Sequence, residues 1–208
     1  MAHSGLLFVF EGPDGVGKTT LVRRTAEALQ SDGRQVDVLS FPGREPGTLG
    51  EHVYSLHHDP AKFGITAMTP ESLQVLHVAA HLDAIDRLIR PRLESGSVVL
   101  LDRYWWSTWV YGISGGGRRT TLDAAIATEV THWGALRPSA LLLISRSESL
   151  RVDEQRSKWL TRVGLYRDLA EMERGKYPIY TIPNNREPEQ ATEMILQTIG
   201  HHWDAEAR

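Results

Sequence analysis

The sequence contains no cysteine among its 208 residues, which excludes disulfides and thiolate metal sites. It also lacks a basic excess, because its formal net charge is −3, and this argues against a general nucleic-acid-binding protein. No apolar run is long enough to span a bilayer, and no basic segment precedes an apolar stretch at the N-terminus. We therefore expect a cytoplasmic protein with neither a membrane nor a nucleic acid as its partner.

Apolar runs alternate along the chain with longer amphipathic stretches. The runs predict strands at residues 6–10, 36–41, 98–101, 141–144 and 177–182. The stretches predict helices at residues 18–31, 48–58, 70–94, 121–133, 147–174 and 187–200, with Pro91 bending or ending the third. This alternation predicts one α/β domain over residues 1–208, a doubly wound sheet of five parallel strands with helices on both faces. Ligands of such a sheet bind at the carboxyl ends of its strands.

A phosphate-binding loop follows the first predicted strand. Residues 12–19 read GPDGVGKT and fit the pattern G-x-x-x-x-G-K-[ST]. Glycines let the backbone N–H groups turn toward phosphate oxygens, Lys18 would bridge the β- and γ-phosphates, and Thr19 would ligate magnesium. The alternative is a glycine-rich turn with an accidental lysine. The pattern predicts a P-loop NTPase that binds ATP and Mg²⁺ through Gly12, Asp14, Gly15, Val16, Gly17, Lys18, Thr19 and Thr20.

A carboxylate follows a second apolar run. Residues 98–101 are all apolar and end at Asp102, which is the pattern of the acid that supports magnesium in P-loop enzymes. A simple cap at a strand end is the alternative. With the loop already present, we expect Thr19 and Asp102 to form the metal site.

Three motifs now resemble the thymidylate kinase family of nucleoside monophosphate kinases. They read FEGPDGVGKTT at residues 10–20, FPGREPG at residues 41–47, and DRY at residues 102–104, followed by Ser107 and Tyr111. The acid inside the loop, Asp14, is typical of the family. The likeness runs from about residue 6 to residue 144 and is thinner afterwards.

The resemblance implies roles for individual residues. Asp14 would face the 3′-hydroxyl of the acceptor sugar, and Arg44 would hold the acceptor phosphate. Arg103 would lie between the acceptor and donor phosphates, and Tyr111 would pack under the sugar and disfavour a 2′-hydroxyl. Without the resemblance, Arg44 would be a loop cation and Tyr111 a core aromatic. The implied catalytic residues are Lys18, Arg44, Asp102 and Arg103; the implied substrate-binding residues are Asp14, Phe41, Arg44, His77, His81, Arg103, Ser107, Thr108 and Tyr111.

The part that would bind the base departs from the family. Members usually place an aromatic residue, and an arginine four residues later, on the long helix before Pro91. Counting back from Pro91, these positions hold His77 and His81, which share one helix face. An imidazole stacks on a base and donates one hydrogen bond, but it lacks the guanidinium fork. One interpretation is that the acceptor is not thymidylate but carries a modified pyrimidine or another base, or is a different phosphorylated molecule. The other is that this register is wrong and both histidines lie on the surface.

The lid also departs from the family. Basic residues follow the fourth predicted strand at Arg151, Arg156, Lys158 and Arg162, but the lid segment, about residues 146–166, is short. Some members carry an arginine where this chain has Val16, so either the lid supplies that charge or the enzyme is slow. A solvated helix face is the alternative, because Glu148, Asp153 and Glu154 interleave with the cations. We expect Arg156 and Arg162 to contact ATP.

The sequence thus predicts transfer of the ATP γ-phosphoryl group to dTMP or a related, including a modified, deoxynucleoside monophosphate. Two alternatives stay open: a kinase of the same fold for another nucleotide or a non-nucleotide phosphorylated metabolite, and a P-loop ATPase regulatory module. A guanine-specific switch would need an N-K-x-D stretch, which the sequence lacks. The resemblance also implies a homodimer. Trp105, Trp106 and Trp109 are expected in the core or at an interface.

Overall fold

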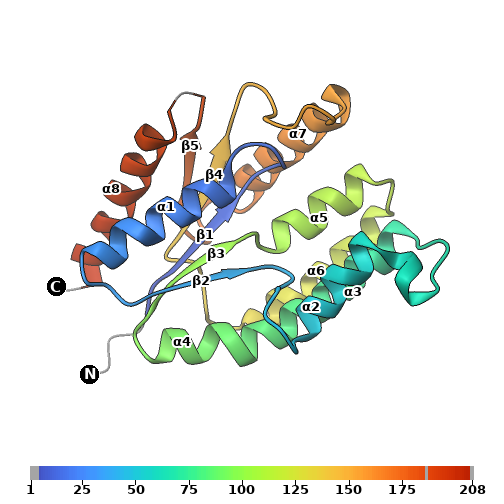
Figure 1. Cartoon of the computed structure of the whole chain (residues 1–208), viewed down its shortest axis with the longest axis horizontal. Helices are drawn as coiled ribbons and strands as arrows, with labels where there is room; N and C mark the ends of the chain where they lie inside the picture. The colour runs from blue at the N-terminus through green and yellow to red at the C-terminus, as the bar shows by residue number, and fades with distance from the viewer. Residues whose placement is uncertain (1–4, 186, 207–208) are drawn as a thin grey trace.

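Five short segments form the strands of one parallel sheet. The computed structural model describes residues 5–185 and 187–206. Its strands are β1 (Leu7–Glu11), β2 (Val36–Ser40), β3 (Val98–Asp102), β4 (Ala140–Ser145) and β5 (Ile179–Pro183). They lie in the order β2-β3-β1-β4-β5, and every neighbouring pair is parallel. This confirms the predicted fold class (Figure 1).

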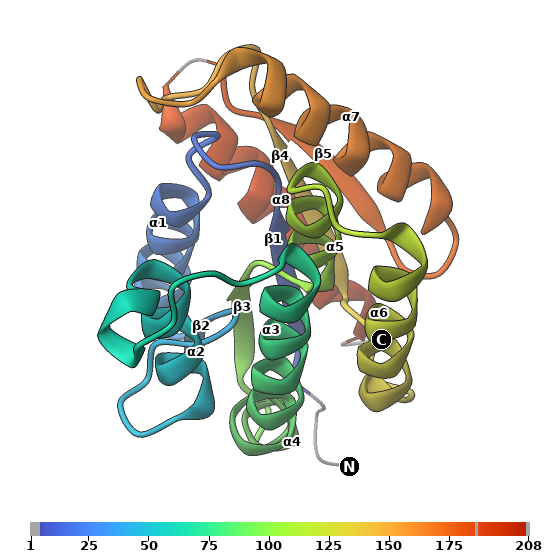
Figure 2. The ribbon, with the colours of Figure 1, turned by 90° about the vertical axis from the view of Figure 1, so that its right-hand side faces the viewer.

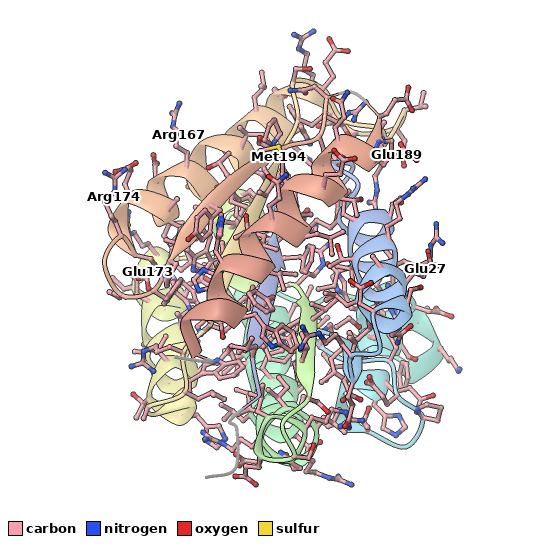
Figure 3. The ribbon with its side chains drawn as sticks, turned by 90° about the vertical axis from the view of Figure 1, so that its left-hand side faces the viewer. Glu27, Arg167, Glu173, Arg174, Glu189 and Met194 are labelled. Atoms are coloured by element: carbon pink, nitrogen blue, oxygen red, sulfur yellow. The ribbon has the colours of Figure 1, made fainter. Side chains whose placement is uncertain are left out.

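Helices cover both faces of the sheet. They are α1 (Lys18–Ser31), α2 (Leu49–His58), α3 (Pro70–Ala84), α4 (Arg90–Glu94), α5 (Trp105–Ser114), α6 (Arg119–Trp133), α7 (Arg156–Met172) and α8 (Pro188–Glu206). A 3-10 turn, η1, spans Pro60–Phe63, and a π-helical turn, η2, spans Ile85–Ile89. Helices α1 and α8 lie on one face and α3 to α6 on the other (Figure 1). Figure 3 shows α1 and α8 side by side, with Glu27 and Met194 pointing outward.

Side chains of the central strand, β1, pack into two separate cores, one on each face of the sheet. Alternate side chains of a strand point to opposite faces. Accordingly, Leu7 and Val9 join the core under α3 to α6, while Phe8 and Phe10 join the core under α1 and α8. All four are at most 1% exposed. Burial on both faces explains why this strand is continuously apolar in the sequence.

The long predicted helix before Pro91 is interrupted rather than ended. Helix α3 continues through the π-helical turn η2 into α4, which contains Pro91. Proline has no N–H for the residue four positions earlier, and its ring clashes with that residue's carbonyl group. The wider turn just before Pro91 accommodates both defects, as π-bulges commonly do.

The structure differs from the sequence prediction in two other segments. Helix α5 was not predicted, and α7 begins at Arg156, so residues 146–155 form a loop rather than the start of a helix. Trp105, Trp106 and Trp109 on α5 are 5%, 0% and 4% exposed and belong to the core. These side chains are therefore core residues and offer no surface to a second copy.

This topology gathers several segments at one end of the sheet. The loop after β1 meets the end of β3 on one side and of β4 on the other, because β1 lies between them. Helix α7 crosses that end, close to the loop (Figure 2). Within the described residues, no helix combines the length and the apolar character needed to cross a membrane.

Candidate active site

Lys18 lies in the cradle formed by the loop after β1. Its Nζ donates hydrogen bonds to the carbonyl oxygens of Gly12 at 2.7 Å and Pro13 at 3.0 Å. Burial, followed by the charge of Arg103, lowers the pKa of Lys18 to about 8 against the opposing pull of nearby acids. Helix α1 begins at Lys18, and no described side chain caps its N-terminus. Backbone N–H groups at such an end favour an anion.

Three distant segments hold the loop in shape. The backbone N–H of Leu150 donates to the carbonyl of Gly15 at 2.8 Å. The indole Nε1 of Trp159 donates to the carbonyl of Asp14 at 3.0 Å, and the Asn184 side-chain amide donates to the carbonyl of Val16 at 2.7 Å. The lid and the end of β5 therefore position the cradle. The sequence reasoning missed Trp159 and Asn184, because neither lies in a motif.

Thr19 and Asp102 meet as predicted. The Thr19 hydroxyl donates to Asp102 Oδ2 at 3.0 Å. The other carboxylate oxygen, Oδ1, is buried and has no hydrogen-bond partner among the described residues. Mg²⁺ that is bound to a phosphate usually takes only one or two oxygen ligands from the protein. The Thr19 hydroxyl and the unpaired carboxylate oxygen of Asp102 could supply them. Within the described residues there is no cluster of three or more histidine or acidic side chains suited to a metal.

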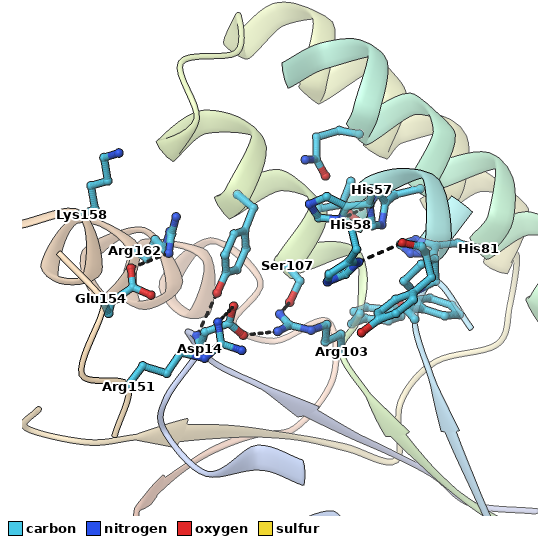
Figure 4. A pocket seen from close by; sticks show the side chains of 18 of the residues that line it. Asp14, His57, His58, His81, Arg103, Ser107, Arg151, Glu154, Lys158 and Arg162 are labelled. Atoms are coloured by element: carbon cyan, nitrogen blue, oxygen red, sulfur yellow. Dashed lines mark hydrogen bonds and ion pairs between the residues drawn. The ribbon is translucent and has the colours of Figure 1, made fainter. Parts of the chain in front are cut away.

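Asp14 lies between two arginines from opposite sides of the site (Figure 4). One of its oxygens pairs with Arg103, and the other lies 3.2 Å from Arg151 Nη1 on the lid loop. Burial alone would raise the pKa of Asp14, but Arg103, Lys18 and Arg151 outweigh it and lower the pKa to about 2. The carboxylate is therefore ionised at neutral pH. It ties the lid loop to the end of β3.

Arg103 follows β3 in an unusual backbone conformation. Its φ of 78° makes it the only non-glycine residue with a positive φ in the described parts of the chain. Such strain persists where the surroundings enforce it, and it clusters at functional sites. The guanidinium also donates to the Ser107 hydroxyl at 3.1 Å. Burial opposes its charge, but Asp14 and other acidic groups raise the pKa of Arg103, so its cation is permanent.

A cavity of about 620 Å³ opens beside this arginine. Every residue predicted to bind the acceptor lines it: Asp14, Phe41, Arg44, His77, His81, Arg103, Ser107, Thr108 and Tyr111. Arg44 enters from the segment after β2, where its guanidinium lies 4.3 Å from the ring centroid of Tyr54. Arg44 and Arg103 therefore line the same cavity, and Arg103 is close enough to Lys18 to act on its charge.

Tyr111 joins the cavity wall to the loop. Its hydroxyl accepts a hydrogen bond from the backbone N–H of Asp14 at 2.8 Å. Burial, partly opposed by Arg103, raises its pKa to about 12, so the phenol is neutral. The ring lies between two cations, with Arg162 at 4.4 Å and Arg103 at 5.5 Å from its centroid. Tyr111 is thus a lining residue held in place from both ends.

Histidines form the opposite wall. His77 and His81 are 9% and 1% exposed and line the cavity, so they are not surface residues. His77 Nε2 lies 3.1 Å from His57 Nδ1, and burial, then the neighbouring histidines, lowers the pKa of His77 to about 2. His81 Nδ1 lies 2.8 Å from a carboxylate oxygen of Glu129 on α6. Glu129 was missed because it lies 48 positions away in the chain and belongs to no motif.

A buried carboxylate behind the loop was also missed. Glu11, the last residue of β1, is 0% exposed. It accepts the backbone N–H groups of Tyr104 at 2.7 Å, Ser107 at 2.9 Å and Gly12 at 3.2 Å, and the Ser107 hydroxyl at 2.8 Å. Burial raises the pKa of Glu11 against the pull of Arg103 and Lys18. One side chain thereby caps α5 and anchors the phosphate loop.

The predicted lid cations divide into two groups. Arg151, Lys158 and Arg162 line the cavity, whereas Arg156, the exposed first residue of α7, does not. Arg162 pairs with Glu154 at 2.8 Å and donates to the Ser114 hydroxyl at 3.2 Å. In the phosphate loop, Val16 is fully buried, Gly17 is half-buried and Thr20 is exposed.

The arrangement places an anion cradle next to a second pocket for an anion. Lys18 and the N-terminus of α1 suit one phosphate chain, and Arg44 and Arg103 suit another phosphate in the adjoining cavity. In-line transfer of a phosphoryl group needs this kind of charge neutralisation and positioning, with little covalent chemistry from the protein.

Comparisons with known proteins place the chain in a family. The thymidylate kinase family model matches residues 10–195. The thymidylate kinase of Pseudomonas fluorescens strain Pf0-1 is 36% identical over 140 residues, which span 67% of this chain and 63% of that relative's length. The Deinococcus radiodurans enzyme of the same name is 35% identical over 146 residues, 70% of this chain and 67% of the relative. A crystal structure of thymidylate kinase from Ehrlichia chaffeensis has a TM-score of 0.73 at 19% identity, covering 94% of this chain and 99% of that one.

Proposed function

Because the chain belongs to the thymidylate kinase family, we propose that it transfers the γ-phosphoryl group of ATP to dTMP or a related, including a modified, deoxynucleoside monophosphate, giving the diphosphate. One observation carries the proposal. The buried Lys18 lies in the phosphate loop, and Asp14 of the same loop lines one cavity together with Arg44 and Arg103.

The residues divide the work by position. Lys18 and the N-terminus of α1 bind the donor phosphates, while Arg44 orients the acceptor phosphate. Arg103 lies between them and neutralises the charge that develops during transfer. Asp14 and Tyr111 hold the acceptor sugar. The acceptor phosphate is already ionised at pH 7, so the reaction needs neither a strong general base nor a covalent enzyme intermediate.

The same proposal assigns the metal site. Thr19 and Asp102 would hold Mg²⁺, because the hydroxyl and the unsatisfied carboxylate oxygen lie together next to Lys18. When bound, the ion neutralises charge on the β- and γ-phosphates. The lid cations Arg151, Lys158 and Arg162 line the cavity and would close over the phosphates, which excludes water.

A screen of nucleoside monophosphates with ATP and Mg²⁺, with ADP release as the readout, tests this function. We expect release above the water background with dTMP or a related deoxynucleotide, and its loss in Lys18→Ala. ATP hydrolysis at one rate whatever acceptor is present would instead support an ATPase regulatory module. No stimulation by any monophosphate, with a phosphorylated metabolite active, would support the other kinase.

A homodimer is also part of the proposal, since the family resemblance implies one. The tryptophans of α5 are buried within one copy, so the dimer face would use other residues. Light scattering after size exclusion measures the mass directly, and a value near 23.3 kDa would reject the dimer.

A further inference from the structure

Tyr166 on α7 is a buried polar side chain that the function proposed above does not use. The residue is 1% exposed, and its hydroxyl lies 2.8 Å from the Ser107 hydroxyl on α5, a hydrogen bond in which either group can be the donor. Burial, and then the charge of Glu11, raises the pKa of Tyr166 well above its ordinary value, so the phenol stays neutral. The hydroxyl therefore reaches Ser107 as an uncharged hydrogen-bonding group.

Three segments of the chain meet at the Ser107 hydroxyl. Arg103, after β3, donates to it from Nη1 at 3.1 Å (Figure 4). Glu11, at the end of β1, lies 2.8 Å away through Oε2. A hydroxyl has one hydrogen and two lone pairs, so Arg103, Glu11 and Tyr166 together use its full capacity. Tyr166 is therefore one side chain away from the guanidinium of Arg103.

Tyr166 also lies on the face of α7 that points toward the site. Trp159, Arg162 and Tyr166 are spaced three and four residues apart, which places them on one face of the helix. Arg162 lines the cavity, and Trp159 donates to the carbonyl of Asp14. The Asp14 carboxylate pairs with the second guanidinium nitrogen of Arg103, Nη2. Helix α7 thus reaches Arg103 by two routes, and Tyr166 provides one of them.

We propose that Tyr166 is a positioning residue that holds Arg103 in place for phosphoryl transfer by fixing the Ser107 hydroxyl between them. The proposal rests on the function proposed above, in which Arg103 neutralises the charge that develops during transfer. A cation aids transfer most where it is already oriented toward that charge. The strained φ of 78° at Arg103 persists only because its surroundings enforce it. Tyr166 does not line the cavity, so it acts through Arg103 rather than on the nucleotide.

Tyr166→Phe tests this role, because it keeps the buried ring and removes only the hydroxyl. We expect kcat to fall by about tenfold, a part of the roughly 100-fold that a misplacement of about 1 Å costs. The KM values for ATP and for the accepted monophosphate should stay within about twofold, since the charge of Arg103 remains in the site. Steady-state kinetics with each substrate varied in turn measure both parameters.

A double substitution tests the route through Ser107. Ser107→Ala removes the hydroxyl that Tyr166 contacts, so Tyr166 then has nothing to hold. Adding Tyr166→Phe to Ser107→Ala should therefore leave kcat within about twofold of the value for Ser107→Ala alone, because the two changes break one chain of contacts. A further fall of about tenfold in the double variant would show that Tyr166 does not act through Ser107, and would overturn the proposal.

Tyr177→Phe is the matched control, because Tyr177 is a second buried tyrosine of the same core. Its hydroxyl accepts a hydrogen bond from Trp106 Nε1 at 3.0 Å and donates to Glu173 Oε2 at 3.2 Å, and neither partner lines the cavity. Both variants lose a buried hydroxyl and should unfold at lower urea concentrations than the wild type. Only Tyr166→Phe should lower kcat.

Three results would overturn the positioning role alone. They are a wild-type kcat in Tyr166→Phe, a change in KM without a change in kcat, and an equal fall in kcat in Tyr177→Phe, which would assign the effect to a loosened core. A wild-type protein that phosphorylates no nucleotide would instead reject the proposed function, and the role of Tyr166 with it.

Discussion

The protonation of the buried Lys18 should make nucleotide binding depend on pH. In the free protein, burial and then Arg103 lower its pKa to about 8. Bound phosphate favours the ammonium form, so above pH 8 nucleotide binding takes up a proton. We therefore expect the Kd for ATP–Mg²⁺ to rise above pH 8, by up to about tenfold per pH unit. Titration calorimetry from pH 7 to 9.5 measures this directly.

The control for this pH dependence is Lys18→Arg, whose side chain stays charged throughout the range. Its affinity for nucleotide should be lower but flat with pH. Tyr111 has a pKa near 12 and does not titrate in the window. The same rise in Kd in both proteins would assign the effect to another group.

The buried carboxylate of Glu11 acts only as a hydrogen-bond acceptor for its neighbours. All four groups that it bonds are donors. In Glu11→Gln the amide nitrogen cannot accept, so at least one buried donor loses its partner. We expect a loss of about 1–3 kcal/mol in the free energy of unfolding, together with reduced turnover, because α5 and the loop lose their common anchor. Urea unfolding measures this free energy for Glu11→Gln and for the surface variant Glu27→Gln, whose stability should change little. Equal stability of the two variants would contradict the prediction.

Single residues also mark the limit of sequence reasoning. Lys18, Thr19 and Asp102 were predictable, because their motif spacing fixes them next to strands. His77 and His81 were predictable by counting from Pro91. Glu129 was not, since its contact with His81 depends on how α6 packs against α3.

The phosphate loop and the lid behave as one element. Gly15 has a φ of +80°, and a Cβ placed there would overlap the Ser149 side chain and lie 3.1 Å from the backbone nitrogen of Leu150. In Gly15→Ala the lid loop must therefore move away from the cradle. We expect kcat/KM to fall by at least about 100-fold, since misplacement of about 1 Å has that effect on transfer.

Gly33 supplies a matched control for the backbone strain. Its φ is +77°, but nothing lies within 4 Å of the corresponding Cβ position. Gly33→Ala should therefore show the strain alone, about 1–2 kcal/mol in the free energy of unfolding, with turnover unchanged. If the two variants lose activity equally, contact between the lid and the loop does not matter for transfer.

Prediction at the scale of elements succeeded where periodicity was strong. Helix α1 has the bounds expected from the sequence, and the five strands lie within two residues of their predicted ends. Helix α5 was missed because its tryptophans and tyrosine gave no clear apolar stripe, and because its N-terminus is capped by Glu11 from another element. The loop at residues 146–155 was missed because its charges mimic a solvated helix.

At the scale of the whole molecule, the donor and the acceptor should bind at two neighbouring sites at the same end of the sheet, and each should bind without the other. Lys18 belongs to the donor site, and Arg44 lies at the acceptor site on the segment after β2. A ligand at 100 times its Kd stabilises the fold by about 2.7 kcal/mol, or about 5–10 °C in Tm for a domain of this size. We expect Tm increases of this order with ATP–Mg²⁺ alone and with the accepted monophosphate alone.

Two variants should separate these increases. Lys18→Ala should lose the Tm increase with ATP–Mg²⁺ and keep it with the monophosphate, because Lys18 lies in the cradle and its charge meets only the donor phosphates. Arg44→Ala should show the reverse, since Arg44 reaches the cavity but not the loop. Thermal melts with each ligand give four values for comparison. If either variant lost both increases, donor and acceptor would share one set of contacts, and the division of the site between loop and cavity would be wrong.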